Sequence, residues 1–306
     1  MPRATVDVAD DGVRLDQFVA RLAGSSVHAA RRFIRDGRVS LDGRSASDGK
    51  KGQHLSAGQS VAVELDGGDA FVTPEPELPL AVLYADAHLV AVDKPAGVPS
   101  HPLLAGERGT LANALVARFP ECAGAGDDRR EAGLGHRLDN GTSGVILAAR
   151  RHDVWLALRA ALKAPSCEKS YLAEVVGRPG ASRGSMREPI GRRGRRGSRV
   201  VVGGQGRNPL PAATEWEVIN LRADSTLLRV RLHAGRAHQV RAHLAALGHP
   251  LVGDQLYGHA PERDVAERLG ATSVRLHAES VRLRHPMSGE SISIEAPPPS
   301  WAKIMG

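Results

Sequence analysis

The chain has 306 residues, enough for one large domain or for a large domain with a small one, which excludes a short disulfide-stapled peptide. Hydrophobic residues make up 42% of the chain and charged residues 25%, a composition that argues against disorder throughout. The net charge of +7 favours a polyanionic partner, either a nucleic acid or an acidic membrane.

The start of the chain, MPRATVDVADDGVRLD, lacks the apolar core of a secretory signal. No stretch approaches the roughly 18 apolar residues that a membrane helix needs. The two cysteines, Cys122 and Cys167, show neither metal-ligand spacing nor a disulfide framework. We therefore expect a cytoplasmic protein with reduced thiols and no membrane partner.

A small unit is predicted over residues 13–66. RLDQFVARL at 14–22 has apolar residues at helical spacing, and a second helix is expected between a serine cap at 25 or 26 and a stop at Gly37. RVSLDGR at 38–44 alternates and turns at its Asp-Gly pair, as a β-hairpin does, and SVAVEL closes the unit as a strand. Three arginines lie close together on the second helix: Arg31, Arg32 and Arg35.

Residues 67–80 are predicted to be a linker, because three prolines beside glycines and acids are incompatible with a continuous helix or a central strand. The larger domain is predicted over residues 81–303, where strand-like runs alternate with helix-like runs. The strand-like runs are HLVAVDKP, VILAAR, SYLAEVVG, LLRVRLH and SISIEAP, and the helix-like runs are TLANALVARF, HDVWLALRAALK and AHQVRAHLAALG. Single strands with varied connections favour a mixed α/β or α+β sheet over a sandwich.

The positive charge is concentrated in one glycine-rich segment of the larger domain. Residues 183–207 hold eight arginines against one glutamate, a net charge of +7, whereas the rest of the chain holds 33 basic and 33 acidic residues. The protein is thus a nearly neutral body with one strongly basic segment.

Common nucleotide, hydrolase and metal patterns are absent. DGRSASDGKKG lacks the spacing of a P-loop, and VVVGGQGRNP lacks the third glycine of a dinucleotide fingerprint. Ser143 does not lie in a G-x-S-x-G nucleophile elbow. His233, His238 and His243 recur every five residues, which does not align them on one helical face, so we expect no metal.

Three residues are candidates for chemistry. In GHRLDNGTSG at 135–144, Asp139 lies in a turn-prone loop that leads into an apolar strand, so it either projects a carboxylate from a rigid base or merely caps a turn. Arg241 lies beside the core face of a helix, where it points into a cleft or forms a surface salt bridge. Tyr171 lies on a strand and is either a functional ring or a core tyrosine.

These motifs resemble the RluA-type pseudouridine synthases. The matching stretches occur in the family's order: KPAGVPSHP at 94–102, HRLDNGTSG at 136–144, KSYLAEVVG at 169–177, TEWEV at 214–218, GRAHQVRAHLAALGHPLVGDQLYG at 235–258 and LHAESVRLRHPMSGE at 276–290. Residues 13–66 resemble the small RNA-binding unit of a ribosomal protein known as the S-four (S4) domain. Many relatives have threonines where this chain has Ala234 and Ala237.

The resemblance implies an α+β protein. Its catalytic domain would have the pseudouridine synthase fold, a mixed and largely antiparallel sheet flanked by helices, and its N-terminal domain would be a small α/β RNA-binding domain. Members isomerise uridine in RNA without a cofactor: the bond from the ribose to N1 is cleaved, the uracil turns, and it is rejoined through C5. Large-subunit ribosomal RNA is the first expected partner and transfer RNA the second, with a monomeric protein.

The family's functional residues map onto this chain one by one. Asp139 would attack the anomeric carbon or take a ribose proton, and Arg241 would hold it ionised and aligned. Tyr171 would stack on the uracil and assist proton removal at C5, while Arg137 would fill the place of the extruded base. The other residues expected to bind RNA are His136, Arg31, Arg32, Arg35, Arg192, Arg193, Arg195 and Arg196.

Two further expectations stay open at the level of sequence. The segment 183–207 is predicted to be a flexible loop beside the active cleft that grips RNA phosphates, and a solvated loop without a ligand is the alternative. The competing functions are a non-catalytic RNA-binding or ribosome-assembly protein on the same fold, and a polyanion-binding protein without preference for RNA.

Overall fold

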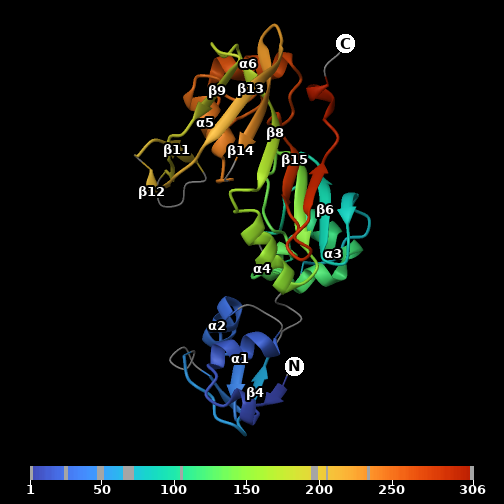
Figure 1. Ribbon diagram of the computed structural model, residues 1–306, viewed down its shortest axis with the longest axis vertical. Coiled ribbons are helices and arrows are strands. Elements are labelled where there is room, and N and C mark those ends of the chain that lie inside the picture. The colour runs from blue at the N-terminus through green and yellow to red at the C-terminus, as the bar shows by residue number, and fades with distance from the viewer. Residues whose placement is uncertain are drawn as a thin grey trace. The chain divides into compact units, whose positions relative to one another are not determined.

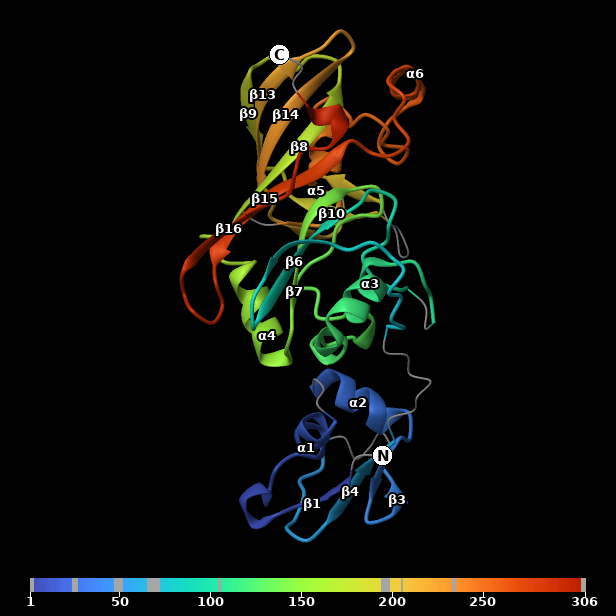
Figure 2. The ribbon, with the colours of Figure 1, turned by 90° about the vertical axis from the view of Figure 1, so that its right-hand side faces the viewer.

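The computed structural model describes residues 3–23, 27–46, 52–64, 72–103, 106–193, 199–204, 206–232 and 235–303, with the backbone alone at 28 and 29. The chain forms two compact units (Figures 1 and 2). The first comprises residues 1–79, 101–134 and 148–156, and the second comprises residues 80–100, 135–147 and 157–306. The domain boundaries expected at 13–66, 67–80 and 81–303 stay a prediction.

The N-terminal part of the first unit is two helices on a small antiparallel sheet. The helices are α1 (Leu15–Leu22) and α2 (Val27–Arg35), and the strands follow the order β1 (Arg3–Thr5), β4 (Ser60–Val63), β2 (Val39–Leu41) and β3 (Arg44–Ser45). The helices cover the sheet (Figure 2) through a core in which Leu15, Phe33 and Val61 are buried. The predicted hairpin is confirmed: Asp42 and Gly43 have φ of 52° and 76°, as a two-residue turn between twisted strands requires.

The rest of the first unit is built on short helices. These are α3 (Leu111–Arg118), η3 (Pro120–Gly124) and η4 (Arg129–Glu131), and a further turn, η1 (Val8–Asp10), precedes α1. Helix α3 begins where the sequence places it because Thr110 and Asn113 form a capping box.

A nine-stranded sheet forms the centre of the second unit. Its order is β5 (Ala81–Ala85), β6 (Leu89–Lys94), β7 (Ser143–Ala149), β15 (Leu276–Arg284), β8 (Glu168–Val176), β14 (Ser225–Leu232), β13 (Thr214–Leu221) and β9 (Arg183–Met186), with β16 (Ser291–Glu295) paired to β15. Strands β7 and β15 run parallel, and β15, β8, β14, β13 and β9 form an antiparallel series. This mixed, largely antiparallel sheet confirms the predicted α+β class.

The helical segments described in the second unit are α5 (Gln239–Ala246), α6 (Ala260–Arg268) and η5 (Ser300–Ala302), and α4 (His152–Ala161) begins in the first unit and ends in the second. Gly144 lets β7 enter the sheet beside β15, because a Cβ there would lie 2.2 Å from the carbonyl oxygen of Ala278, and its φ is 109°. The loop that precedes Gly144 therefore starts from a fixed point at the sheet.

The arginine-rich segment differs from its prediction. The predicted flexible loop is wrong for part of this segment. Strands β10 (Ile190–Arg192), β11 (Val200–Val202) and β12 (Arg207–Leu210) form a three-stranded antiparallel sheet in the order β11, β10, β12. The glycines that suggest flexibility instead permit close backbone packing, because a Cβ on Gly191 would lie 2.7 Å from the Cα of Gly206. Arg195 and Arg196 lie outside the described residues.

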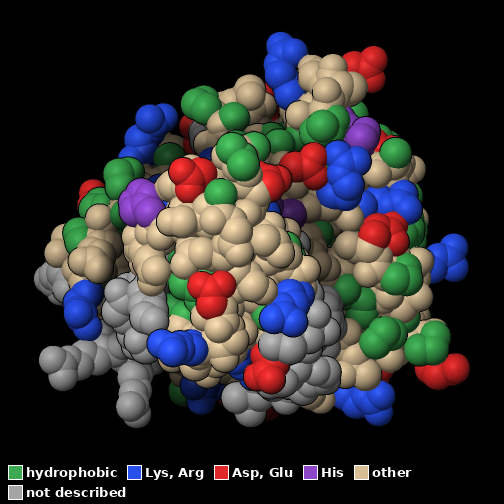
Figure 3. Space-filling view, turned by 90° about the horizontal axis from the view of Figure 1, so that it is seen from below, with side chains coloured by type: hydrophobic (Ala, Val, Ile, Leu, Met, Phe, Trp, Pro, Cys, Tyr) green, Lys and Arg blue, Asp and Glu red, His purple; other side chains and the backbone are tan. Residues whose placement is uncertain are grey.

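The charged surface is mixed where Figure 3 shows it. Lys and Arg side chains on that face stand among Asp and Glu side chains, without one continuous basic patch. In the described ranges, no helix is both long and apolar enough to cross a membrane.

Candidate active site

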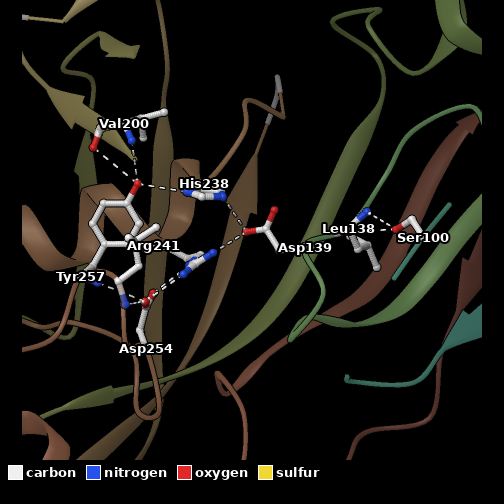
Figure 4. A network of polar contacts seen from close by, with 9 residues as sticks. Ser100, Leu138, Asp139, Val200, His238, Arg241, Asp254 and Tyr257 are labelled. Carbon is white, nitrogen blue, oxygen red and sulfur yellow. Dashed lines mark hydrogen bonds and ion pairs between the residues drawn. The ribbon is translucent and has the colours of Figure 1, made fainter. Parts of the chain in front are cut away.

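The loop that carries Asp139 is fixed on both sides of that residue. The Ser100 hydroxyl donates to the carbonyl of Leu138 at 2.8 Å and accepts the Leu138 N–H at 3.2 Å (Figure 4). The Thr142 N–H donates to the carbonyl of Asp139 at 3.0 Å, which closes a turn just before β7. The loop that carries Asp139 is therefore held at Leu138 by Ser100 and at Thr142 by its own turn, as the predicted rigid loop requires.

Lys94 supports the same loop from the end of β6. Its ammonium is buried and donates to the carbonyls of Pro95 at 2.9 Å, Val98 at 2.7 Å and Asn140 at 3.1 Å. Burial lowers the pKa of Lys94 to about 8, and the charges of nearby carboxylates, including Asp139, oppose that effect. Lys94 thus joins the KPAGV stretch to the residue that follows Asp139.

Arg241 connects Asp139 to a second carboxylate. From α5, its Nη1 donates to Oδ2 of Asp139 at 2.8 Å, while its Nε and Nη2 form a bidentate pair with Asp254 at 2.8 and 2.9 Å (Figure 4). Burial alone would lower the pKa of Arg241, but its bonds to the two carboxylates outweigh that and raise it. The guanidinium is therefore a permanent cation with a fixed plane.

Asp254 is itself held in place. Its Oδ1 accepts the N–H groups of Leu256 at 2.9 Å and Tyr257 at 3.1 Å, and its side chain is fully buried. The turn after β-bridge residue Leu251 thus fixes Asp254, and Asp254 in turn fixes the plane of Arg241.

His238 and Tyr257 connect Asp139 to the three-stranded sheet of β10, β11 and β12, termed the arginine-rich sheet. His238 Nε2 lies 3.6 Å from Oδ2 of Asp139, beyond hydrogen-bond distance, and its Nδ1 lies 3.1 Å from the Tyr257 hydroxyl. That hydroxyl accepts the N–H of Val200 at 2.9 Å, at the start of β11. Helix α5 begins at Gln239, later than predicted, because His238 has a left-handed φ of 56°.

Asp139, His238 and Arg241 line a cavity of about 430 Å³. The structure brings five of the predicted residues to its wall: His136, Arg137, Asp139, Tyr171 and Arg241. The cationic residues of the wall are Arg137, Arg159, Lys163, Lys169, Arg236 and Arg241, whereas Asp139 is its one carboxylate within the described part of the chain. Such a lining attracts phosphate, and it presents the negatively charged oxygens of one carboxylate.

His136 and Tyr171 are neutral members of the wall. Burial lowers the pKa of His136 to about 3, and its Nε2 accepts the N–H of Leu147 at 3.2 Å, so this ring anchors the loop to β7. Burial also raises the pKa of Tyr171 well above its usual range, which keeps its phenol protonated. Tyr171 lies on β8, opposite Val230 of β14 and Ala278 of β15.

The other predicted RNA-binding residues lie elsewhere on the chain. Arg31 of α2 pairs with Asp16 at 2.7 Å and Arg35 with Asp36 at 3.4 Å, both in the N-terminal part. Arg192 ends β10. The roles of these residues, and those of Arg32 and Arg193, stay predictions. Ala237 lines the cavity, and Ala234 lies outside the described residues.

The sequence did not predict four residues around Asp139 as functional candidates: Lys94, His238, Asp254 and Tyr257. Each lies in a stretch that carries the family resemblance, KPAGVPSHP or GRAHQVRAHLAALGHPLVGDQLYG, so position in those motifs was the available signal. The sequence predicts no metal site at His238 and indicates no other role for it. Across the described ranges, no group of three or more His, Cys, Asp or Glu side chains is arranged to hold a metal ion.

The chain is similar to known proteins over most of its length. Residues 88–246 match the model of the RNA pseudouridylate synthase family, and residues 13–51 match that of the S4 domain. The chain is 36% identical to a ribosomal large subunit pseudouridine synthase D of Xanthomonas campestris, over 97% of this chain and 89% of that protein. It is 34% identical to a protein of the same name from Yersinia pestis, over 94% and 87% of the two chains.

A solved structure shows the same likeness. The human RNA pseudouridylate synthase domain containing 1 superposes with a TM-score of 0.57 at 28% identity, covering 72% of this chain and 83% of that one.

Proposed function

Because this chain belongs to the RNA pseudouridylate synthase family, we propose that it converts specific uridines of large-subunit ribosomal RNA to pseudouridine at Asp139. The family makes the chain an isomerase whose substrate is RNA. The ribosomal target is supported by the names of the Xanthomonas and Yersinia relatives, and transfer RNA is the second candidate. We further propose a cytoplasmic monomer that needs neither metal nor cofactor.

One observation carries the assignment of Asp139: among the described residues it is the single carboxylate in a cationic cavity, and they hold it by one oxygen. Arg241 binds Oδ2, and no described residue hydrogen-bonds Oδ1. The positive lining favours the RNA backbone, and the free Oδ1 is available to the ribose. Arg241 stabilises the ionised carboxylate without covering its second oxygen.

Two routes use this oxygen. In the first, Oδ1 attacks C1′ while the C1′–N1 bond breaks and its electron pair stays on the uracil. The uracil turns, C5 bonds to C1′, and the Asp139–C1′ ester bond breaks. In the second, Asp139 takes the C2′ proton as the C1′–N1 bond breaks, and it returns that proton when C5 adds to the glycal. In both routes C5 finally loses its proton and N1 gains one.

The surrounding residues fit the handling of an extruded base. A uridine must leave the stack to reach Asp139, and unstacking costs a few kcal/mol. The exposed Arg137 is proposed to fill the vacated place, since a guanidinium both stacks and binds phosphate. Tyr171 offers its ring to the uracil. The arginines of α2 and of β10 are proposed to bind phosphates outside the cavity.

The proposal is tested by locating pseudouridines in the RNA of cells with and without the protein. Mass spectrometry with a label specific for pseudouridine should show one or more large-subunit positions lost in its absence. An unchanged map, together with normal RNA binding, would favour the non-catalytic RNA-binding alternative.

Asp139→Asn tests the residue assignment. The amide keeps the shape and removes the charge, so purified variant should bind RNA as the wild type does and form pseudouridine at least about 10²- to 10³-fold more slowly. A wild-type rate would overturn the role of Asp139. The matched control is Asp16→Asn, which removes a buried carboxylate from α1 and should leave the rate at saturating RNA unchanged.

A further inference from the structure

A chain of polar contacts runs from the arginine-rich sheet to Asp139. The Val200 N–H of β11 donates to the Tyr257 hydroxyl at 2.9 Å, that hydroxyl lies 3.1 Å from Nδ1 of His238, and Nε2 of His238 faces Oδ2 of Asp139 at 3.6 Å (Figure 4). The proposed mechanism uses Asp139 and Arg241 but gives no role to His238 or Tyr257.

The Tyr257 hydroxyl has one proton and two possible acceptors. The carbonyl of Val200 lies 3.4 Å away, and Nδ1 of His238 lies 3.1 Å away. The Val200 N–H occupies one lone pair of the hydroxyl. If the hydroxyl proton points at Nδ1, the closer acceptor, Nδ1 carries no proton; if it points at the Val200 carbonyl, Nδ1–H donates to the second lone pair. Burial raises the pKa of Tyr257, so that proton stays on the hydroxyl.

Electrostatics at Asp139 favour the first of these arrangements. A neutral imidazole carries one proton, and burial lowers the pKa of His238 although the charge of Asp139 opposes this. With the proton on Nδ1, the Nε2 lone pair would face a carboxylate oxygen, which is repulsive. With the proton on Nε2, a positive hydrogen faces Oδ2.

We propose that Tyr257 fixes His238 as the Nε2–H tautomer, so that His238 and Arg241 together hold Oδ2 of Asp139 and leave Oδ1 to react. His238 and Tyr257 are then positioning residues, and the 3.6 Å separation closes to a hydrogen bond when RNA is bound. This inference rests on the proposed role of Asp139.

The same contacts connect the arginine-rich sheet to the carboxylate. The Tyr257 ring lies under two guanidinium groups, with Arg241 5.3 Å and Arg199 5.2 Å from its centroid. Arg199 directly precedes Val200, whose N–H the Tyr257 hydroxyl accepts. A phosphate bound at this edge of β11 would therefore change the position of Tyr257, the residue that orients His238.

A pair of substitutions at His238 separates this role from a purely structural one. A Gln side chain reaches to the position of Nε2 and can donate to Asp139, whereas Asn reaches only to the position of Nδ1. The backbone prefers the opposite order, because Asn tolerates the left-handed φ of 56° better than Gln does. If His238 only fits the turn, Asn is the better replacement; if it donates to Asp139, Gln is.

We expect single-turnover pseudouridine formation to fall about 10- to 100-fold in His238→Asn, and clearly less in His238→Gln, with RNA affinity unchanged in both. Tyr257→Phe keeps the ring and should cost about 3- to 10-fold. An Asn variant as fast as the Gln variant, or faster, would overturn the inference.

A second measurement needs no substrate. The ¹⁵N chemical shifts of the histidine ring nitrogens report which nitrogen carries the proton. His243 provides an internal reference, because its Nε2 lies 2.9 Å from the carbonyl of Glu188 and must donate, while its Nδ1 accepts from Thr214 at 2.8 Å. We expect His238 to match His243 in the wild type and to show a smaller fraction of the Nε2–H tautomer in Tyr257→Phe, where only Asp139 still favours it.

An Nδ1–H pattern for His238 in the wild type would overturn the inference. Wild-type protein that forms no pseudouridine, yet shows the Nε2–H pattern, would instead refute the proposed function and leave the tautomer assignment standing.

Discussion

Two carboxylates of the second unit, Glu174 and Asp139, both bind arginine but differ in how many of their oxygens are used. Glu174 of β8 is fully buried, and its Oε1 accepts from Ser225 at 2.5 Å and Arg222 at 2.7 Å while its Oε2 accepts from Arg275 at 2.5 Å. Asp139 is 21% exposed, faces a cavity, and uses only Oδ2 in its bond to Arg241.

The difference lies in whether the carboxylate keeps an oxygen that faces the cavity without a described hydrogen-bond donor. Burial raises the pKa of Glu174, but hydrogen bonds from Ser225 and the two arginines outweigh it and lower that pKa below its usual value. Every oxygen of Glu174 is satisfied, so the cluster can only stabilise the fold. Asp139 has one oxygen without a described donor and is placed where a substrate can enter.

Glu174→Gln should give the largest effect, a loss of stability of the folded protein. Removing the charge leaves Arg222 and Arg275 beside a neutral amide, and breaking a buried pair costs about 3 kcal/mol or more, here at the lower end because Arg222 keeps access to water. The rate of pseudouridine formation per folded molecule should stay close to wild type. Urea unfolding and single-turnover assays measure the two effects.

The pH dependence of that difference has a defined sign. Because the pKa of Glu174 is lowered by folding, its contribution is fully present above the ordinary Glu pKa of about 4.3 and is lost as pH falls through the lower folded value. The gap in unfolding free energy between wild type and Glu174→Gln should therefore be wide at pH 7 and narrow at acidic pH. A gap independent of pH would contradict the assignment.

Asp254→Asn should affect the reaction more than the fold. The variant weakens the bidentate pair that sets the plane of Arg241, so the guanidinium can turn away from Oδ2 of Asp139. We expect a 10- to 100-fold loss in single-turnover rate, corresponding to a hydrogen bond between charged groups, with RNA affinity unchanged. Asp16→Asn, which breaks a bidentate pair with Arg14, is the control that should leave the rate alone.

Lys94→Met removes a buried positive charge whose described hydrogen-bond partners are backbone carbonyls. The pKa of Lys94 is about 8 in the folded protein and about 10.4 in an unfolded chain, so between these values the unfolded chain binds more protons and stability rises with pH. From pH 8 to pH 10 the unfolding free energy of the wild type should rise relative to that of Lys94→Met by at most about 1.4 kcal/mol per pH unit.

The smallest effect is expected at the arginine-rich sheet. Changing Arg192 and Arg193 to Gln should reduce the slope of log affinity against log salt by about 2, one per phosphate contact, with no change in rate at saturating RNA. Changing Arg282 and Arg284 of β15 alters the net charge equally and is the control. Equal slopes in both double variants would reject the proposal that this segment binds RNA phosphates.

Much of the fold follows from local pattern in the sequence. The hairpin at Asp42-Gly43, the helix capped by Thr110 and the strand after Asp139 form where their turn residues and apolar spacing predict them. The arginine-rich segment does not follow its pattern, because glycines are as compatible with close strand packing as with a flexible loop. Only the meeting of Gly191 and Gly206 distinguishes these two uses.

Motif residues and their order are local properties, so the sequence alone was enough to predict the family, the α+β class and the candidates Asp139, Arg241 and Tyr171. The tertiary structure decided which of their atoms meet. Asp139 and Arg241 are separated by 102 residues, so only the sheet and α5 bring Nη1 to one carboxylate oxygen. It also placed Lys94, Asp254, His238 and Tyr257 around them, since hydrogen bonds act over about 3 Å in space and not along the chain. The net charge of +7 predicted a polyanionic partner, but among the described residues the cations that line the cavity all lie outside the basic segment 183–207, so only folding brings them around Asp139.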